Sequence, residues 1–151
     1  MNEMNIQSLS RLTHLCSIIP DKFSTLTEVE WTTRPSPEKW NRKEILGHLI
    51  DSATNNHHRF VRAQFEDKPL ITYYADDWVA ASRYHDMPVP HLVAFWQIYN
   101  LHIAELIRQI PAEIMSRKCH TGDEAPHTLA WIFDDYVVHL EHHLREMVDY
   151  D

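Results

Sequence analysis

The sequence predicts an all-α protein, a four-helix bundle with a long crossover between its second and third helices. Apolar residues recur at helix-like intervals in four stretches, each long enough for several turns. Only two glycines occur among 151 residues, which is typical of a chain with few tight turns. The one β-prone run, LITYY at residues 70–74, stands alone, so no extended sheet is predicted. The length suits one domain with its own core, and residues 1–151 are predicted to form it.

The first two helical stretches are delimited by prolines and by a capping motif. The first stretch covers about residues 5–27, with an interruption expected at Pro20 because proline lacks a backbone N–H. The prolines of RPSPEKW then break the chain. The second stretch begins at Asn41, an N-cap with Glu44 three residues later, and runs to about Gln64.

The last two stretches follow a long link. The third helix is predicted to begin after Pro90 and to end near Ile110, and the fourth to run from an N-cap at Thr128 to about Asp149. The link, residues 65–90, is long enough to run the length of the bundle and leave the second and third helices parallel. Structureless links of this length are usually functional. Its aromatic and histidine side chains suit the wall of a pocket: Tyr73, Tyr74, Trp78, Tyr84 and His85.

Composition excludes several classes of protein. The formal net charge is -8, and no basic stripe offsets it, so nucleic-acid binding is not expected. No apolar run is long enough to cross a bilayer, and the N-terminus lacks the pattern of a secretory signal, so no membrane partner is expected. The two cysteines, Cys16 and Cys119, form neither a disulfide framework nor a thiolate metal site. A cytoplasmic location is the expectation.

Residues 139–143 read HLEHH, which places three of the twelve histidines within five residues. His139 and His143 lie one turn apart on one face of a helix, so they can chelate one metal ion. His142 lies about 60° to the side and can at most compete for this role. The alternative interpretation of such a pair is an exposed polar face.

Two zinc-protease motifs do not fit this segment. H-E-x-x-H requires glutamate directly after the first histidine, where this chain has Leu140, and H-x-x-E-H requires glutamate at position 142. Glu141 lies on roughly the opposite side of the helix from the chelating face, so it is a poor general base. The geometry therefore disfavours a metalloprotease.

A third ligand is expected from another helix, and His48 is the best candidate. His48 lies about two turns into the second helix, so antiparallel packing on the fourth helix would bring it level with His143. Gly47 supports this, because a glycine inside a helix costs roughly 1 kcal/mol relative to alanine and usually marks close packing or ligand approach. The alternative for His48 is a hydrogen-bonded core histidine. Seven others are predicted to be non-ligands: His57, His58, His85, His91, His102, His120 and His127.

Three segments together resemble one known family. RPSPEKWNRKEILGHLIDSATNNHHRF is similar to the second-helix region of the DinB-like superfamily, YYADDW resembles its crossover, and HLEHHLREM resembles its closing helix with the pattern H-x-x-H-H. The resemblance spans about residues 8–150 and is greatest to the branch with the bacillithiol transferases and metal-dependent hydrolases. It implies one metal ion held by His48, His139 and His143, transfer of a low-molecular-weight thiol, and association as a homodimer.

Such a site would be catalytic, because three neutral imidazoles leave coordination positions open. Imidazole ligands suit zinc or nickel, with iron or manganese as further candidates. A bound ion lowers the pKa of a thiol or of water, which matters because the chain offers no convincing protein base. The resemblance implies a low-molecular-weight thiol as the cosubstrate, acting on an electrophilic small molecule, a reaction that needs no such base.

The residues around the ligands suggest further roles. Ser52, Asn55, Arg59 and Arg62 lie within roughly 40° of His48 on the helical wheel. Asn55, Arg59 and Trp78 are predicted to bind substrate, Arg59 through a carboxylate of the thiol. Asp51 and Asp135 are predicted to accept the second N–H of a ligating histidine. Solvated carboxylates and surface ion pairs are the alternatives for these charged residues.

Three functions remain open from the sequence. The first is a metal-dependent thiol S-transferase in detoxification or stress. The second is a metal-dependent hydrolase that uses metal-bound hydroxide with the same ligands. The third is a non-catalytic metal-binding helical protein.

Overall fold

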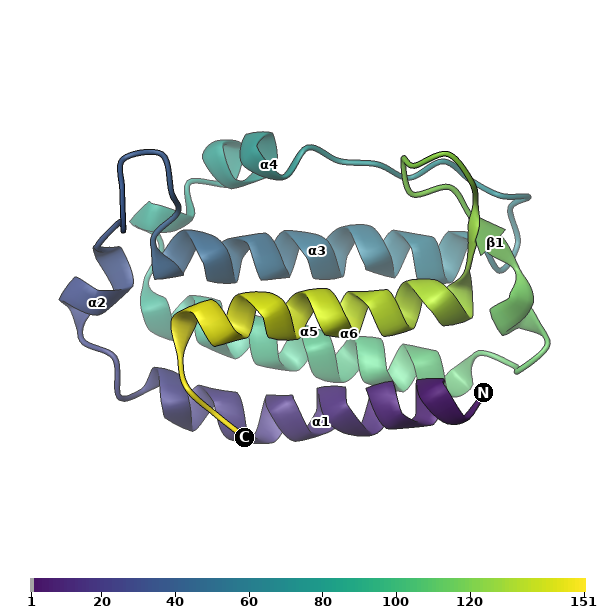
Figure 1. The fold of residues 1–151 in the computed structure, drawn as a ribbon, viewed down its shortest axis with the longest axis horizontal. Coiled ribbons are helices and arrows are strands. Elements are labelled where there is room, and N and C mark those ends of the chain that lie inside the picture. The colour runs from purple at the N-terminus through teal and green to yellow at the C-terminus, as the bar shows by residue number, and fades with distance from the viewer. Residues whose placement is uncertain (1) are drawn as a thin grey trace.

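The computed structural model describes residues 2–151 and contains four long helices packed as a bundle (Figure 1). Each long helix contacts two others, α1 and α3 both packing against α5 and α6. The predicted four-helix bundle is therefore confirmed. The helices are α1 (Glu3–Phe23), α3 (Arg42–Arg62), α5 (Val89–Gln109) and α6 (Leu129–Met147).

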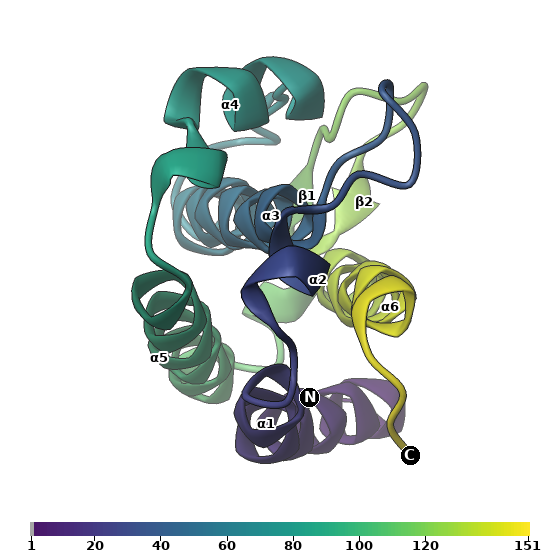
Figure 2. The same cartoon turned by 90° about the vertical axis from the view of Figure 1, so that its left-hand side faces the viewer.

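The crossover gives this bundle its topology. α3 and α5 run in the same direction, and α1 and α6 run in the opposite direction (Figure 1). The link between α3 and α5 therefore returns along the bundle, as predicted. It is not structureless, because it forms the helix α4 (Ala75–Ser82) and the short 3₁₀ helix η1 (Tyr84–Asp86). Seen end on, α4 covers the outer side of α3 (Figure 2).

The remaining elements are short and lie at the two ends of the bundle. α2 (Glu28–Thr32) precedes α3, and the 3₁₀ helix η2 (Ile114–Ser116) follows α5. A small antiparallel hairpin joins β1 (Lys118–Cys119) to β2 (His127–Thr128). The β-prone LITYY run forms only an isolated bridge, Leu70 to His120. No helix within residues 2–151 combines the length and apolar character that crossing a membrane requires.

The predicted interruption of the first helix at Pro20 is wrong, since α1 continues through Pro20 to Phe23. A proline inside a helix leaves the carbonyl four residues earlier without its usual partner. Here that carbonyl belongs to Cys16, and the side chain of Gln97 on α5 donates a hydrogen bond to it at 2.9 Å. A tertiary contact thus supplies the missing donor, and the helix continues.

The predicted helix starts are confirmed. Asn41 caps α3 in a capping box with Glu44, each residue accepting a hydrogen bond from the other's backbone N–H. Thr128 caps α6 by accepting from the backbone N–H of Trp131. α5 begins at Val89, two residues before the start expected after Pro90, and Pro90 lies in its first turn, where a missing N–H costs nothing.

The core lies between the four helices and consists mainly of aliphatic and aromatic side chains. Most buried polar side chains are concentrated on α3, which α4, α5 and α6 enclose. Burying polar groups is costly unless they are hydrogen-bonded or bind a ligand. The buried polar residues of α3 are Lys43, Glu44, His48, Asp51, Ser52, Asn55, Asn56 and Arg59.

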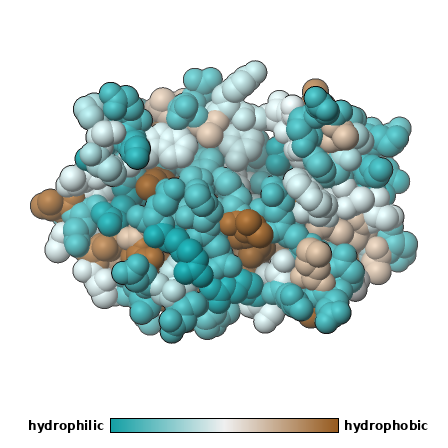
Figure 3. All heavy atoms as spheres, viewed as in Figure 1, coloured by the Kyte–Doolittle hydropathy of each residue, from teal (hydrophilic) through white to brown (hydrophobic). Residues whose placement is uncertain are grey.

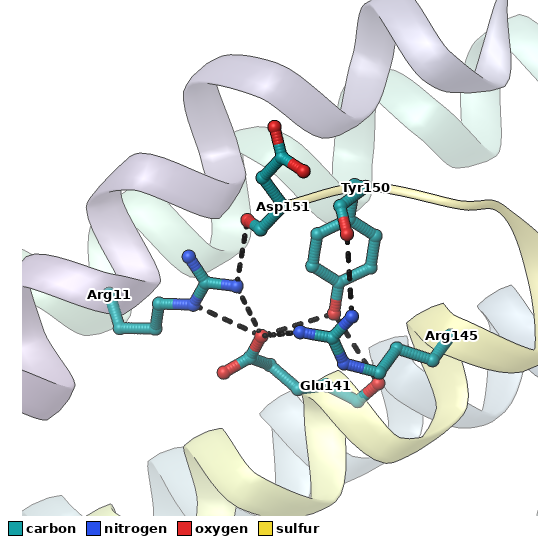
Figure 4. A network of polar contacts seen from close by, with 5 residues as sticks. All are labelled: Arg11, Glu141, Arg145, Tyr150 and Asp151. Atoms are coloured by element: carbon teal, nitrogen blue, oxygen red, sulfur yellow. Dashed lines mark hydrogen bonds and ion pairs between the residues drawn. The ribbon is translucent and has the colours of Figure 1, made fainter.

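A network of polar contacts fastens the C-terminal segment to α1 and α6 (Figure 4). Glu141 accepts two hydrogen bonds from Arg11, at 3.0 and 2.7 Å, and one from the Tyr150 hydroxyl at 3.1 Å. The Arg145 guanidinium lies 4.4 Å from the centre of the Tyr150 ring. Glu141 is therefore held on the α1 side of α6, away from the face that carries His139 and His143, as the helical geometry predicted.

A double-mutant cycle on Arg11 and Glu141 should measure this network. The pair is more buried than most surface ion pairs, and Tyr150 donates to the same carboxylate oxygen, so we expect a coupling free energy of about 0.5–1 kcal/mol from urea unfolding of Arg11→Ala, Glu141→Ala and the double variant. The more exposed pair Arg62–Glu66, at 2.6 Å, is the control and should give only about 0.3–0.5 kcal/mol. A coupling for Arg11–Glu141 no greater than the control's would contradict the structural role assigned to the network.

Candidate metal centre

The structure brings together the three histidines that the sequence singled out. His48 comes from α3, and His139 and His143 come from successive turns of the antiparallel helix α6. The Nε2 atoms of His48 and His139 lie 3.1 Å apart, and one ring nitrogen from each of the three residues lies within 4.8 Å of the others. The ring centroids are 4.7–5.0 Å apart.

Two of the three imidazoles, those of His48 and His139, are in the protonation state that a metal ligand needs. Burial, helped by the neighbouring histidines, lowers the pKa of His48 to about 3. Burial and the charges of His143 and His142 lower the pKa of His139 to about 4. Both rings are therefore neutral at neutral pH, and each has one unprotonated ring nitrogen that can bind a cation.

The donor set fits a divalent metal ion. Two nitrogen ligands held about 2.0–2.1 Å from one ion lie about 3.0–3.4 Å apart, a range that includes the His48–His139 separation. The Nδ1 atom of His48 is buried and has no hydrogen-bond partner among residues 2–151, so the protein leaves the ring polar groups incompletely satisfied. Whether the three residues ligate an ion stays a prediction, but nothing in their geometry opposes it.

Gly47 is the position where the crossover meets α3. A Cβ atom there would lie 2.1 Å from Cδ2 of Tyr84, so only glycine admits the tyrosine ring. The close packing predicted from this glycine is thus present, and the partner is Tyr84 of η1. The hydroxyl of Tyr84 donates a hydrogen bond to Asp51, one turn along α3.

The two aspartates that were expected to orient histidines, Asp51 and Asp135, are not hydrogen-bonded to them. No hydrogen bond joins Asp51 to His48; its Oδ1 accepts from Tyr84, and its buried Oδ2 has no partner among residues 2–151. Burial raises the pKa of Asp51 to about 6, against the opposing effect of the Tyr84 hydrogen bond. No hydrogen bond joins Asp135 to His139 within the described chain, and burial raises the pKa of Asp135.

Glu146 occupies the role that was predicted for the aspartates. Its Oε2 lies 3.2 Å from Nδ1 of His143, and its Oε1 lies 3.4 Å from Nε2 of the exposed His142. Sequence reasoning missed this residue, although its spacing of three from His143 places it on the same side of α6. A carboxylate on Nδ1 leaves Nε2 of His143 free to face the centre.

Replacing Glu146 by alanine should therefore weaken metal binding. Loss of the carboxylate that orients a ligating histidine typically costs 10–100-fold in metal affinity, so we expect about tenfold or more for Glu146→Ala, measured by competition with a chelating dye. Glu141→Ala is the matched control on the same helix, because Glu141 contacts α1 and no histidine of the centre. Equal affinities for the wild type and Glu146→Ala would show that His143 needs no such support.

A polar cavity of about 270 Å³ opens beside His139. Four segments form it: α3, α6, the start of the crossover, and the loop of the β1–β2 hairpin. Its lining residues are Ser52, Asn56, Arg59, Tyr73, Thr121, Asp123, Trp131, Ile132, Asp135, Tyr136 and His139.

Arg59 is the one arginine in this cavity. Its guanidinium donates to the carbonyl of Ile71, at 2.8 and 3.2 Å, and to the side-chain oxygen of Asn56 at 3.2 Å. The residue is only 9% exposed, and no carboxylate of residues 2–151 lies within ion-pair distance of it. A buried guanidinium without an anionic partner favours an anionic group on a bound molecule.

The other residues predicted to contact substrate do not line the polar cavity. Asn55 is buried and donates to the backbone carbonyl of Asp51, so it does not line the polar cavity; Asn56, one residue later, does. Trp78 on α4 packs edge-on against Tyr73 with centroids 5.9 Å apart, one contact away from the cavity. Arg62 pairs with Glu66 on the surface. Of the polar residues that the sequence singled out beyond the histidines, four reach the lining: Ser52, Arg59, Tyr73 and Asp135.

Comparisons with known proteins agree with this fold. A family model described as the DinB superfamily matches residues 19–147. A protein of Halalkalibacterium halodurans, named as a putative metal-dependent hydrolase, is 26% identical over 97% of this chain and 86% of its own length.

Two solved structures share the fold. YfiT from Bacillus subtilis, described as a probable metal-dependent hydrolase with an unusual four-helix bundle topology, has a TM-score of 0.88 at 20% identity, over 97% of this chain and 85% of its own. A histidine-to-alanine mutant of a mycothiol-dependent maleylpyruvate isomerase has a TM-score of 0.77 at 12% identity, over 97% of this chain and 63% of its own.

Proposed function

The chain belongs to the DinB superfamily, and on that basis we propose that it is a metal-dependent enzyme that transfers a low-molecular-weight thiol to an electrophilic small molecule. One observation carries the proposal: three imidazoles, two of them held neutral by burial, converge beside a polar cavity that contains a buried arginine. One of the compared structures is named as a mycothiol-dependent enzyme, which supports thiol chemistry on this fold.

His48, His139 and His143 would hold one divalent ion, with zinc or nickel as the preferred candidates for imidazole ligands and iron or manganese as alternatives. When bound, the ion supplies Lewis acidity that lowers the pKa of a thiol or of water. Glu146 would keep His143 oriented. Glu141, the carboxylate between the two histidines of α6, is engaged by Arg11 on the other side of the helix and would take no part as a base.

Arg59 would hold a carboxylate of the thiol in the polar cavity. Hydrogen bonds to Ile71 and Asn56 already orient its guanidinium group. In the reaction, the sulfur forms a bond to the electrophilic carbon, and the leaving group departs with the electron pair of the broken bond. The thiol proton passes to solvent. Asp135, which lines the same cavity, would meet an ammonium group of the thiol.

A metal-dependent hydrolase is the second candidate. It is favoured by the names of two similar proteins, the relative from Halalkalibacterium halodurans and YfiT. The same ligands would serve it, so the two functions differ only in whether a thiol or water attacks.

A paired assay tests the proposal and separates these functions. Zinc- and nickel-loaded protein is given 1-chloro-2,4-dinitrobenzene with cysteine, glutathione or bacillithiol, and separately 4-nitrophenyl acetate without thiol. We expect metal-dependent conjugation with at least one thiol and its loss in His139→Ala. Thiol-independent ester turnover that is lost in the same variant would favour the hydrolase. Full metal loading without either activity would leave a non-catalytic metal-binding protein.

A further inference from the structure

A second cavity lies on the other side of the three histidines and has a different chemical character. We propose that it binds the electrophilic substrate, as an uncharged apolar molecule, while the polar cavity around Arg59 binds the anionic thiol. This assignment rests on the proposed function and adds the class of the second substrate to it.

The two cavities lie at opposite ends of the seam between α3 and α6. The second cavity, of about 480 Å³, is formed by the loop before α3, the first turns of α3 and α4, and the last turn of α6. The polar cavity is formed by later turns of α3, earlier turns of α6 and the hairpin loop. The loop between α2 and α3 and the hairpin loop rise at the two ends of this face (Figure 1). The three histidines lie between the two cavities.

The second cavity reaches the centre through two direct contacts. The ring of Trp40 lies 4.9 Å from the ring of His48, centroid to centroid. Glu146, which also lines the cavity, lies 3.2 Å from Nδ1 of His143. A molecule seated against Trp40 and Glu146 would therefore lie one side chain away from His48 and His143, whereas the polar cavity includes His139 in its own lining. Two substrates would approach the centre from opposite sides.

The lining of the second cavity selects against anions. Its walls are Pro35, Trp40 and Ile45, which suit an aromatic or aliphatic molecule. Its charged lining residues are three carboxylates and one ammonium: Glu38, Asp76, Glu146 and Lys39. Carboxylate groups in excess repel an anionic ligand. The polar cavity also contains two carboxylates, Asp123 and Asp135, but Asp123 pairs with His127, and the buried Arg59 has no carboxylate of residues 2–151 within ion-pair distance. An anionic group can therefore bind at Arg59, and the two cavities are complementary to different molecules.

The surrounding surface fits a small molecule better than a protein partner. On the face seen in Figure 3, hydrophobic side chains form separate small groups within a mostly hydrophilic surface. No continuous apolar area on this face extends the second cavity into a docking surface.

Two unreactive probes test the assignment, 1,3-dinitrobenzene and its anionic counterpart 3,5-dinitrobenzoate. Trp40 lines the second cavity and Trp131 lines the polar cavity. In ¹⁵N-labelled, zinc-loaded protein, the indole N–H signal of each tryptophan reports whether a probe occupies its cavity. The signals are assigned with Trp40→Phe and Trp131→Phe. We expect dinitrobenzene to shift the Trp40 signal and to bind there roughly tenfold more tightly than dinitrobenzoate.

Variants that reverse the charge of carboxylates in the second cavity test the assignment further and leave the histidines unchanged. Glu38→Lys combined with Asp76→Lys, both at exposed positions, should raise the affinity of dinitrobenzoate at Trp40 roughly tenfold and leave that of dinitrobenzene nearly unchanged. The control combines Asp67→Lys and Glu113→Lys, exposed positions that follow α3 and α5, and should change neither affinity.

The outcomes separate this inference from the proposed function. Dinitrobenzene that shifts only the Trp131 signal, or that binds no better than dinitrobenzoate at Trp40, would overturn the assignment even if thiol conjugation occurs. Selective binding of dinitrobenzene at Trp40 supports the assignment even if no conjugation is found, in which case the proposed function fails by itself.

Discussion

Replacing His48 with alanine is expected to abolish stoichiometric metal binding. His48 is the single predicted ligand on α3, and without it only His139 and His143 on α6 remain. Structural zinc sites with four ligands bind with roughly 10–16 kcal/mol, so one ligand accounts for about 3–4 kcal/mol and its loss weakens binding roughly 10²–10³-fold. Plasma mass spectrometry on tag-free protein should find about one ion per chain in the wild type and almost none in His48→Ala after dialysis.

His142→Ala is the matched control for this prediction. His142 lies in the same HLEHH segment, but its side chain is exposed, and it can join only an alternative group with His143 and Glu146. We expect His142→Ala to retain the ion. If instead His142→Ala lost the ion and His48→Ala kept it, the metal would bind at that exposed alternative group, and the proposed centre would be wrong.

A thermal melt provides a second measurement of the same centre. An ion that binds only the folded protein stabilises it by about 2.7 kcal/mol at one hundred times its dissociation constant. The wild type should therefore melt at a higher temperature when zinc or nickel is added, and His48→Ala should not respond. This comparison does not depend on finding a substrate.

Gly47→Ala is expected to destabilise the protein by about 1–3 kcal/mol, although alanine is the better helix former by about 1 kcal/mol. The added Cβ would lie 2.1 Å from the Tyr84 ring, so the ring must move. Its movement would break the hydrogen bond to the buried carboxylate of Asp51, whose other oxygen already has no partner within residues 2–151. Urea unfolding of both proteins measures the difference.

A Tyr84→Ala background separates the steric clash from other effects of this substitution. Without the ring, the new methyl group has space, and Gly47→Ala should become neutral or stabilising by up to about 1 kcal/mol. The reversal of sign is the expected result. If Gly47→Ala destabilised both backgrounds equally, the contact with Tyr84 would not explain why glycine occupies this position.

Much of the fold could be predicted because local chemistry determines it. Asn41 and Thr128 begin helices through hydrogen bonds to backbone atoms three residues away, and such spacing is visible in a sequence. The continuation of α1 through Pro20 was not predictable in this way. It depends on Gln97, which lies 81 positions from Cys16 in the chain.

The same distinction applies to the candidate site: features set by local spacing were predictable, and features set by packing between distant segments were not. The chelating pair of α6 follows from helical periodicity, and His48 follows from the expected antiparallel packing together with Gly47. Glu146, the partner of His143, was also predictable, since it lies one turn away on the same helix. The prediction named aspartates for this role instead. The contact of Tyr84 with Asp51, and the positions of Asn55 and Asn56 relative to the cavity, depend on how the crossover packs on α3.

The separation of the histidines along the chain affects the order of events during synthesis. His48 and His139 are 91 residues apart, and α6 is the last of the four long helices to leave the ribosome. Because the chain emerges from its N-terminal side, α1, α3 and α5 are synthesised before His139 and His143 exist. If the three histidines hold an ion as proposed, its capture would follow docking of α6, and a nascent chain that fails to dock α6 would not gain the metal.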